Sequence, residues 1–384
     1  MKIAILKERR PYEKRVAATP DTVKKYRALG YDVVVEAGAG AEAAYPDDYY
    51  AAAGAQIVAD ALIVREADIV LKVQRPMSES EGRNEVGLIK PGAVLIGILN
   101  PYAARGELDA YARGGLTAMS MELMPRITRA QTMDVLSSQS NLAGYKAVLD
   151  AAEQFGRALP MMMTAAGTVP PARVMIMGAG VAGLQAIATA RRLGAIVSAT
   201  DVRPIAKEQV ESLGATFVMV ESEETKLAET SGGYAKEMSE DYKRRQAELI
   251  AETIKKQDIV ICTALIPGRA APKLISEDML RSMKPGSVIV DLAVEQGGNC
   301  ALSEPGKVVE AFGVKIVGHR NTPSRIAVDS SALYARNLLN FVTLISAKEG
   351  GKLTINWDDE IVKGVALTKD GAIIHPQFTT ASAS

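Results

Sequence analysis

The sequence predicts an α/β protein with two doubly wound parallel-sheet domains, separated by a cleft and linked by two long helices. Short apolar runs alternate with amphipathic segments in the first third of the chain. In the middle of the chain, an apolar strand leads through a glycine-rich turn into a helix, and two long helical patterns flank this block. The 384 residues, 48 % of them hydrophobic, are enough to build a core in two or three domains.

The first third of the chain is typical of βαβ units. Its apolar runs are short and several are rich in β-branched residues, which favours buried strands of a parallel sheet. The segments between them have helical spacing, and the first one stops at Gly30. The predicted strands are residues 2–6, 32–36, 68–73, 93–99 and 117–121, and the predicted helices are residues 21–29 and 46–53.

A pair of glycines, Gly38 and Gly40, follows the second predicted strand. Two interpretations are open: a plain turn, or a loop that binds phosphate. The residues after Gly40 are Ala41, Glu42 and Ala43, so the third glycine of a phosphate-binding loop is missing. We therefore expect a turn, and no dinucleotide fingerprint in this region.

Two long helical patterns, residues 132–156 and 328–347, flank a second α/β block. This arrangement indicates that the block is inserted into a discontinuous first domain. We predict one domain of residues 1–136 and 328–384 that lacks a fingerprint, and a dinucleotide-binding domain of residues 137–327. The cleft between the two domains is then the expected working site.

The middle block contains a complete dinucleotide fingerprint. The predicted strand 173–177 runs into Gly178, Gly180 and Gly183, and the predicted helix 184–193 follows. In this pattern, the first glycine permits a tight turn, the second lets the backbone approach a pyrophosphate, and the third allows close packing of helix on strand. The helix N-terminus offers free N–H groups and a positive dipole end to the phosphates. The expected backbone contacts include Val181 and Ala182.

An acidic residue, Asp201, ends the next predicted strand, 195–200. A carboxylate at this position accepts the hydroxyls of the adenosine ribose and repels a 2′-phosphate, which favours NAD(H) over NADP(H). Arg203 supports the opposite choice, because a nearby arginine can hold a 2′-phosphate; the carboxylate takes precedence because it lies at the strand end itself. The alternative is a glycine turn in a related domain that binds no nucleotide.

Groups that transfer protons are scarce. A dehydrogenase that oxidises an alcohol or an amine needs a general acid or base beside the nicotinamide, and histidine usually serves. Only His319 and His375 occur. We expect His375 to lie on the surface of the tail, whereas His319 follows the strand-like residues 314–318 and either faces a cleft or is a satisfied polar group.

Charge and cysteine content exclude several classes of protein. The 45 basic and 45 acidic side chains cancel, so no net field attracts nucleic acid or an anionic membrane. The uncharged stretches 158–172 and 174–190 are too short, and the first too rich in proline, to span a bilayer. Cys262 and Cys300 lack the spacing of metal ligands, so we expect no metal site and a reducing, cytoplasmic compartment.

Five motifs, in order along the chain, resemble the alanine dehydrogenase and nicotinamide nucleotide transhydrogenase superfamily. They are RVAATP at residues 15–20, EAGAG at 36–40, LKV at 71–73, GAGVAG at 178–183 and VDLAVEQGG at 290–298. The resemblance extends over nearly the whole chain.

The sequence departs from the alanine dehydrogenase branch of this superfamily. By the resemblance, Arg15 and Lys72 match the two cations that hold the substrate carboxylate in that branch. The catalytic histidine of that branch would fall near Asn100, which cannot carry a proton, and the aspartate before Gln-Gly-Gly is replaced by Glu295. Both departures argue against alanine oxidation.

Four other segments resemble the NAD(H)-binding component, domain I, of proton-translocating transhydrogenases. They are RITRAQTMD at residues 126–134, GGYAKEM at 232–238, LYARNLL at 333–339, and the tail 357–371. The resemblance implies a homodimeric subunit that exchanges hydride with an NADP(H)-binding subunit, while membrane-spanning subunits move protons. It implies a location on the cytoplasmic side of the membrane, attached through those partners.

The same resemblance implies which residues hold the cofactor. Residues around the nicotinamide and its ribose are Arg126, Gln131, Asp134, Ser137 and Ser138; Gly233 and Tyr234 belong to a loop that closes over the nucleotide; and Gln246, Thr263, Ala264, Leu265 and Val202 are further expected contacts. Taken without the family, Arg126 is a surface cation and Asp134 a first-turn carboxylate favoured by the helix dipole. The polar segment 221–243 is either this lid or a plain solvated loop.

Hydride transfer between two nicotinamides needs no proton at the reacting carbons, so the shortage of histidine agrees with the transhydrogenase interpretation. Two alternatives stay open: an amino-acid dehydrogenase that uses Arg15 and Lys72, and a sensor that binds NADH and regulates a partner.

Overall fold

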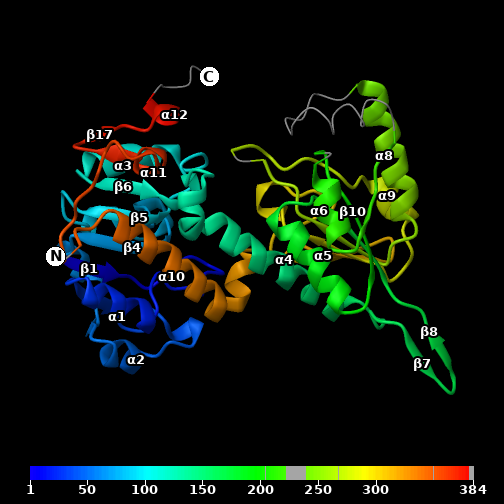
Figure 1. The fold of residues 1–384 in the computed structure, drawn as a ribbon, viewed down its shortest axis with the longest axis horizontal. Coiled ribbons are helices and arrows are strands. Elements are labelled where there is room, and N and C mark those ends of the chain that lie inside the picture. The colour runs from blue at the N-terminus through cyan, green and yellow to red at the C-terminus, as the bar shows by residue number, and fades with distance from the viewer. Residues whose placement is uncertain (204, 222–238, 267, 349, 380–384) are drawn as a thin grey trace. The chain divides into compact units, whose positions relative to one another are not determined.

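The structure is a computed structural model that describes residues 1–203, 205–221, 239–266, 268–348 and 350–379 (Figure 1). The chain forms two compact units: unit 1 comprises Met1–Gln139 and Pro323–Ser384, and unit 2 comprises Ser140–Thr322. These boundaries compare with predicted boundaries at 136/137 and 327/328. Each unit has its own parallel sheet with helices packed against it, so the predicted α/β class with two Rossmann-like domains is confirmed.

The sheet of unit 1 has six parallel strands in the order β3-β2-β1-β4-β5-β6. The order reverses between β1 and β4, which is the switch point of a doubly wound sheet. The strands are β1 (Lys2–Ile5), β2 (Asp32–Glu36), β3 (Gln56–Val58), β4 (Ile69–Gln74), β5 (Val94–Ile98) and β6 (Thr117–Ser120).

Both faces of this sheet are covered, which explains why its strands are apolar throughout. Along β1, Ile3 and Ile5 join the core beneath α1 (Pro20–Ala28) and α10 (Ala327–Leu344). Ala4 joins a second core beneath α3 (Arg105–Arg113) on the other face. The remaining elements of unit 1 are α2 (Asp47–Ala52), α11 (Glu360–Val365), β16 (Thr368–Lys369), β17 (Ala372–Ile373) and α12 (Pro376–Thr379).

Two predictions about unit 1 meet clear outcomes. Gly38 and Gly40 form a turn that leads into a 3-10 helix, as expected, and a side chain at Gly40 would collide with Tyr50. The prediction that His375 lies on the surface is wrong, because only 8 % of it is exposed. Its ring packs against Phe378, with the ring centroids 5.2 Å apart, because α12 folds the tail back onto the unit. Burial lowers the pKa of His375.

The sheet of unit 2 repeats the winding of the first sheet, in the order β11-β10-β9-β12-β13-β15-β14, with β14 antiparallel at one edge. Alternate residues of its first strand enter two separate cores, Val174 and Ile176 on one face and Met175 and Met177 on the other. The strands are β9 (Arg173–Met177), β10 (Ile196–Thr200), β11 (Thr216–Phe217), β12 (Ile259–Cys262), β13 (Val288–Asp291), β14 (Val308–Ala311) and β15 (Val314–Val317). The helices are α5 (Val181–Arg192), α6 (Ala206–Ser212), α8 (Glu240–Ile254) and α9 (Glu277–Ser282).

Some boundaries differ from the prediction. The long helix α4 (Val135–Gln154) starts three residues later than the predicted 132, because residues 128–133 form a 3-10 helix and Asp134 caps α4. The strand expected at 215–220 shrinks to β11, because the backbone N–H of Val220 donates to the side chain of Gln246 instead of to a neighbouring strand.

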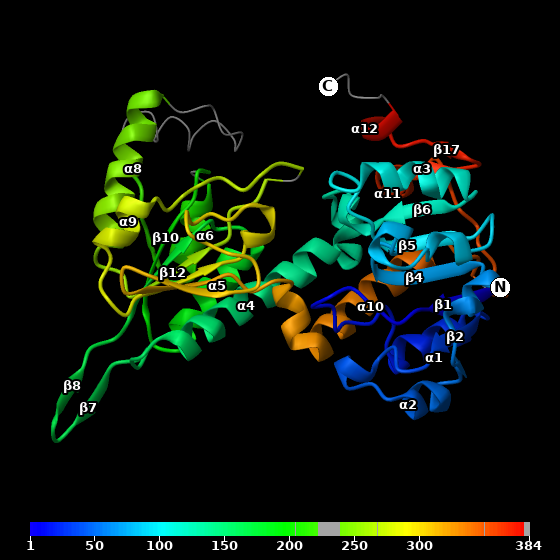
Figure 2. The same ribbon diagram turned by 180° about the vertical axis from the view of Figure 1, so that it is seen from behind.

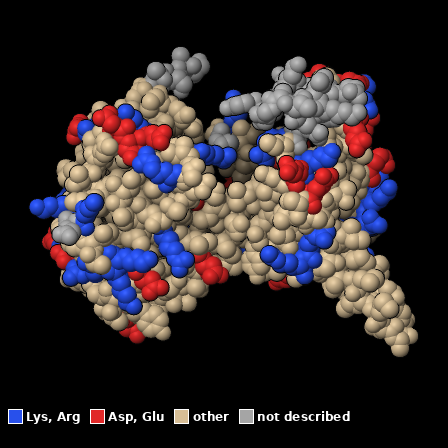
Figure 3. Space-filling view, viewed as in Figure 1, with Lys and Arg blue, Asp and Glu red and all other residues tan. Residues whose placement is uncertain are grey.

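A hairpin of two short strands, β7 (Met162–Thr164) and β8 (Gly167–Val169), projects from the body of unit 2 (Figure 2). Figure 3 shows charges of both signs scattered over the visible face, whereas this projection carries none. Met161, Met162 and Met163 are 59 %, 44 % and 78 % exposed. The hairpin therefore presents an apolar surface to water, which is unusual for three successive methionines.

Candidate functional site

The fingerprint turn has the geometry that its glycines predict. The chain leaves β9 through Gly178 in a left-handed conformation, with φ of +107°, and α5 starts three residues later. A Cβ atom on Gly183 would lie 1.8 Å from the carbonyl oxygen of Gly178, whereas a Cβ on Gly180 would meet nothing within 4 Å. Gly183 is therefore required for packing, and Gly180 leaves an open approach to the backbone.

The first turn of α5 offers donors to an anion. Gly180 occupies the N-cap position, and no side chain among the described residues caps this helix. The peptide N–H groups that begin α5 at Val181 and Ala182 thus lie at the positive end of the helix dipole. This arrangement can bind the pyrophosphate of a dinucleotide.

Asp201 lies at the carboxyl end of β10, beside the fingerprint. One carboxylate oxygen accepts the backbone N–H of Ala179 at 2.7 Å, and the other accepts the backbone N–H and Nε of Arg203 at 2.8 and 2.9 Å. Burial alone would raise the pKa of Asp201, but the hydrogen bonds from Arg203 and Ala179 lower it below its usual value. The carboxylate is thus ionised and can accept ribose hydroxyls, while Val202 beside it is 85 % exposed.

We expect Asp201→Asn to weaken NADH binding about tenfold. A neutral amide is a weaker acceptor than a carboxylate, and a charge-assisted hydrogen bond contributes about 1.5–3 kcal/mol. Calorimetric titration with NADH measures the change. Asp241→Asn, on the exposed face of α8, is the matched control. An unchanged affinity in Asp201→Asn would place the adenosine end of the nucleotide elsewhere.

A loop after β12 forms another wall of the candidate nucleotide site. The hydroxyl of Thr263 donates to the carbonyl of Gly178 at 2.8 Å, which ties this loop to the fingerprint. The side chain of Asn299 accepts the N–H of Ala264 and donates to its carbonyl, at 3.1 and 2.9 Å. Leu265 is 46 % exposed. Sequence reasoning missed Asn299, although it directly follows the VDLAVEQGG motif.

Three of the predicted cofactor contacts need comment. The amide of Gln246 bonds the backbone of Val218 and Val220 and the hydroxyl of Thr200, so it fixes the ends of β10 and β11. Its direct contact with a cofactor stays a prediction. Gly233 and Tyr234 lie outside the described residues, and so does most of the predicted lid.

The residues expected around the nicotinamide all belong to unit 1. Arg126 and Gln131 are exposed, and neither side chain has a hydrogen bond or ion pair within the portion of the chain that the structure describes. Asp134 caps α4, accepting the N–H of Ser137 at 2.9 Å and its hydroxyl at 2.6 Å. The structure therefore brings Asp134 and Ser137 together, whereas direct binding of a cofactor by these four residues stays a prediction.

Ser138 is used inside the fold. Its hydroxyl donates to the side-chain oxygen of Asn337 at 2.7 Å. Asn337 and Asn340, both on α10, donate to the carbonyl of Thr132 at 2.8 and 3.0 Å. The segment that carries Gln131 and Asp134 is thus held in place by α10.

Arg15 and Lys72, the two cations that resemble substrate anchors, are buried and paired with glutamates of the same chain. Arg15 donates twice to Glu13, at 2.7 and 2.8 Å, and is 5 % exposed. Lys72 lies 2.9 Å from Glu85 and 3.4 Å from Glu8, and it is 1 % exposed. Their charge is therefore neutralised within unit 1.

The position that resembles the catalytic histidine of alanine dehydrogenases holds Asn100. It has φ of +50°, and its backbone N–H donates to the carboxylate of Glu122. Glu295 accepts the backbone N–H of Asn321 at 2.8 Å. His319 is half-buried after β15, in unit 2, and His375 is buried in the tail of unit 1.

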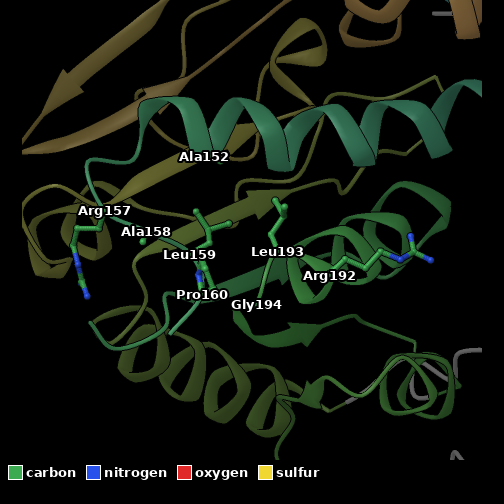
Figure 4. A pocket seen from close by; sticks show the side chains of 8 residues that line it. All are labelled: Ala152, Arg157, Ala158, Leu159, Pro160, Arg192, Leu193 and Gly194. Carbon is green, nitrogen blue, oxygen red and sulfur yellow. The ribbon is translucent and has the colours of Figure 1, made fainter. Parts of the chain in front are cut away.

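A separate hollow lies at the opposite end of α5 from the fingerprint. Figure 4 shows Leu159, Pro160 and Leu193 in it, with Arg157 and Arg192 at its rim. It adjoins Gly194, which precedes β10, and so it lies at the amino ends of the strands. Dinucleotides bind at the carboxyl ends, so this hollow is not the nucleotide site.

The described residues hold neither a metal cluster nor a membrane-spanning helix. No group of three or more His, Cys, Asp or Glu side chains is placed to hold a metal ion there. No helix in the described ranges combines the length and the apolar character that crossing a membrane requires.

Two doubly wound sheets, one with a complete fingerprint and its acidic partner, define a two-domain α/β protein with a dinucleotide-binding fold. Two family models match: alanine dehydrogenase/PNT, N-terminal domain, over residues 4–143, and alanine dehydrogenase/PNT, C-terminal domain, over residues 147–376. The chain belongs to the alanine dehydrogenase/PNT family, which confirms the resemblance drawn from its motifs.

Three relatives place the chain within this family. It is 60 % identical over 380 residues to a chain of Rhodospirillum rubrum named as an NAD(P) transhydrogenase subunit alpha, with 99 % of each chain covered. A crystal structure of transhydrogenase from Sinorhizobium meliloti matches with a TM-score of 0.88 at 55 % identity, covering 97 % of this chain and 100 % of that one. An L-alanine dehydrogenase structure matches with a TM-score of 0.80 at 26 % identity, covering 98 % of both chains.

Proposed function

We propose that this chain is the NAD(H)-binding subunit of a proton-translocating NAD(P) transhydrogenase. The observation that carries the proposal is the end-to-end likeness, at 60 % identity, to a chain named as an NAD(P) transhydrogenase subunit alpha. The reaction is NADH + NADP⁺ → NAD⁺ + NADPH, in which a hydride leaves C4 of one nicotinamide and joins C4 of the other. The NADP(H) belongs to a partner subunit.

The candidate site supports this reaction. The fingerprint and Asp201 suit the pyrophosphate and adenosine ribose of NAD(H), and Asn100 replaces the proton carrier that alanine oxidation needs. Arg126 and Gln131 offer exposed polar groups for the carboxamide and ribose of the nicotinamide, and Asp134 and Ser137 follow them along the chain. Hydride transfer between two rings depends on their positioning, which such hydrogen bonds supply.

The test is an isotope experiment. NADH deuterated at C4, mixed with this chain and an NADP(H)-binding subunit in membrane vesicles, should deliver its deuterium to NADPH. L-Alanine and NAD⁺ given to the chain alone should yield no NADH. Deuterium lost to water, or turnover with alanine alone, would contradict direct transfer and favour the amino-acid dehydrogenase.

The complex that we propose also contains membrane-spanning subunits that move the protons, with this chain attached through them at the cytoplasmic face of the membrane. The chain itself would be a homodimer. The exposed methionines of the β7–β8 hairpin support such an association, because an isolated two-stranded hairpin is marginally stable in water. Neither a metal nor nucleic acid has a role in this proposal.

We expect the double substitution Met161→Ser, Met163→Ser to convert dimers into monomers, because it removes the most exposed apolar side chains of the hairpin. Sedimentation equilibrium of the purified chain measures the mass. Tyr49→Ser, on exposed α2 of unit 1, removes a similarly exposed apolar side chain and is the control. A variant with the same dimer affinity as the wild type would show that the hairpin is not the contact.

A further inference from the structure

Arg15 begins a continuous row of hydrogen bonds that ends beside Gln131. Its Nη1 donates to the side-chain oxygen of Gln139 at 2.8 Å, while the rest of the guanidinium is clamped by Glu13. Glu13 also accepts the amide of Gln74 at 2.7 Å, so the clamp is fixed to the end of β4. The arginine is thus held on one side and directs Nη1 at α4.

Gln139 passes the row onward. It lies in the first turns of α4, one residue after Ser138, and is 6 % exposed. Its amide nitrogen donates to the carbonyl of Ser330 at 3.1 Å and to the hydroxyl of Ser138 at 3.3 Å. A glutamine here can serve both neighbours because it has an acceptor and a donor on one planar group.

The row then reaches the segment before α4. The hydroxyl of Ser138 donates to Asn337, and the amide nitrogen of Asn337 donates to the carbonyl of Thr132, at 2.7 and 2.8 Å. Every link from Arg15 to Thr132 donates in the same direction. Such a series polarises its members cooperatively, and its burial makes each broken link costly.

We propose that Arg15 is a positioning residue for hydride transfer, which acts through Gln139, Ser138 and Asn337 on the segment 131–137. This inference rests on the proposed function, because that segment holds the nicotinamide only if the chain binds NAD(H) as proposed. In this role Arg15 needs no contact with the cofactor or with a substrate carboxylate. It fixes the angle at which Gln131 and Asp134 are presented, and small misplacements of such groups lower rates strongly.

The test cuts the row at a residue outside the cofactor contacts. Gln139→Met keeps the volume and the Arg15–Glu13 pair but removes the hydrogen bonds to Arg15 and Ser138. We expect the kcat of hydride transfer to fall about ten- to hundredfold, as displaced reacting groups do. The Kd for ADP-ribose, which needs only the fingerprint and Asp201 in unit 2, should not change. Asn337→Leu should produce the same fall in kcat.

The combination of variants separates positioning from mere stability. Gln139→Met with Asn337→Leu should lower kcat no further than either substitution alone, because both cut one row. Arg15→Lys retains the charge beside Glu13 but loses the fork, so its kcat should match that of Gln139→Met. An unchanged kcat in Gln139→Met, an additive double variant, or a parallel loss of ADP-ribose affinity would overturn the inference. Absence of transfer in the wild-type chain with its partner would instead overturn the proposed function, and the inference with it.

Discussion

Gly180→Ala is expected to weaken NADH binding tenfold or more while the chain stays folded. A Cβ atom at this position meets nothing within 4 Å and the residue has a φ of −77°, so alanine fits the free protein without strain. The added methyl group would occupy the space that the pyrophosphate needs to reach the N–H groups of α5. Each charge-assisted hydrogen bond lost there is worth about 1.5–3 kcal/mol. Calorimetry with NADH and a urea titration measure the two effects.

Gly183→Ala is the contrasting variant. Its Cβ would lie 1.8 Å from the carbonyl oxygen of Gly178, so α5 would have to move off β9. Overpacking of this kind costs about 1–3 kcal/mol and here we expect the upper end of that range or more. A stable Gly183→Ala chain, or a Gly180→Ala chain that binds NADH normally, would show that this turn is not the pyrophosphate site.

Lys72→Met is expected to destabilise unit 1 by about 3–5 kcal/mol, the usual loss when one partner of a buried ion pair is removed. Glu8 and Glu85 would then face each other's charge in the core without the cation between them. Urea unfolding measures the loss. The control is Lys90→Met, which breaks a partly exposed pair with Asp68 and should cost about 1 kcal/mol or less.

The loss in Lys72→Met should depend on pH. Burial would raise the pKa of Glu85, but Lys72 lowers it overall, so this pair stabilises the wild type above the ordinary glutamate pKa and less as acid protonates it. The pKa of Glu8 is raised by burial, so its charged form opposes folding as pH rises. The variant should therefore approach the wild type in stability below about pH 4, near the ordinary glutamate value. Glu85→Gln added to Lys72→Met should restore some of the loss. No recovery by either route would mean that the ion pairs do not stabilise the core.

The local features of the site could be predicted from the sequence. Gly178, Gly180 and Gly183 follow one strand and open one helix, and Asp201 ends the next strand, so their spacing alone indicates how they meet. The same holds for the cap at Asp134, whose partner Ser137 is three residues away. Short-range patterns of this kind depend on the geometry of a single turn.

The long-range contacts could not be predicted. Arg15 meets Gln139, 124 residues away, and the loop at Ala264 is held by Asn299, 35 residues away. No periodicity marks such pairs, because they form only when separate elements pack. For the same reason the sequence suggested that Arg15 and Lys72 were free to bind a substrate, whereas tertiary packing surrounds both with carboxylates.

The bidentate contact between Arg203 and Asp201 has a consequence for how fast nucleotides arrive. A bare carboxylate at the mouth of the site would repel a dinucleotide, whose two phosphates are negative, during diffusional approach. With its charge cancelled by the guanidinium, that repulsion is absent until the ribose docks and exchanges hydrogen bonds with the pair. Encounter should then be nearly insensitive to ionic strength, so that added salt slows neither capture nor exchange of the coenzyme.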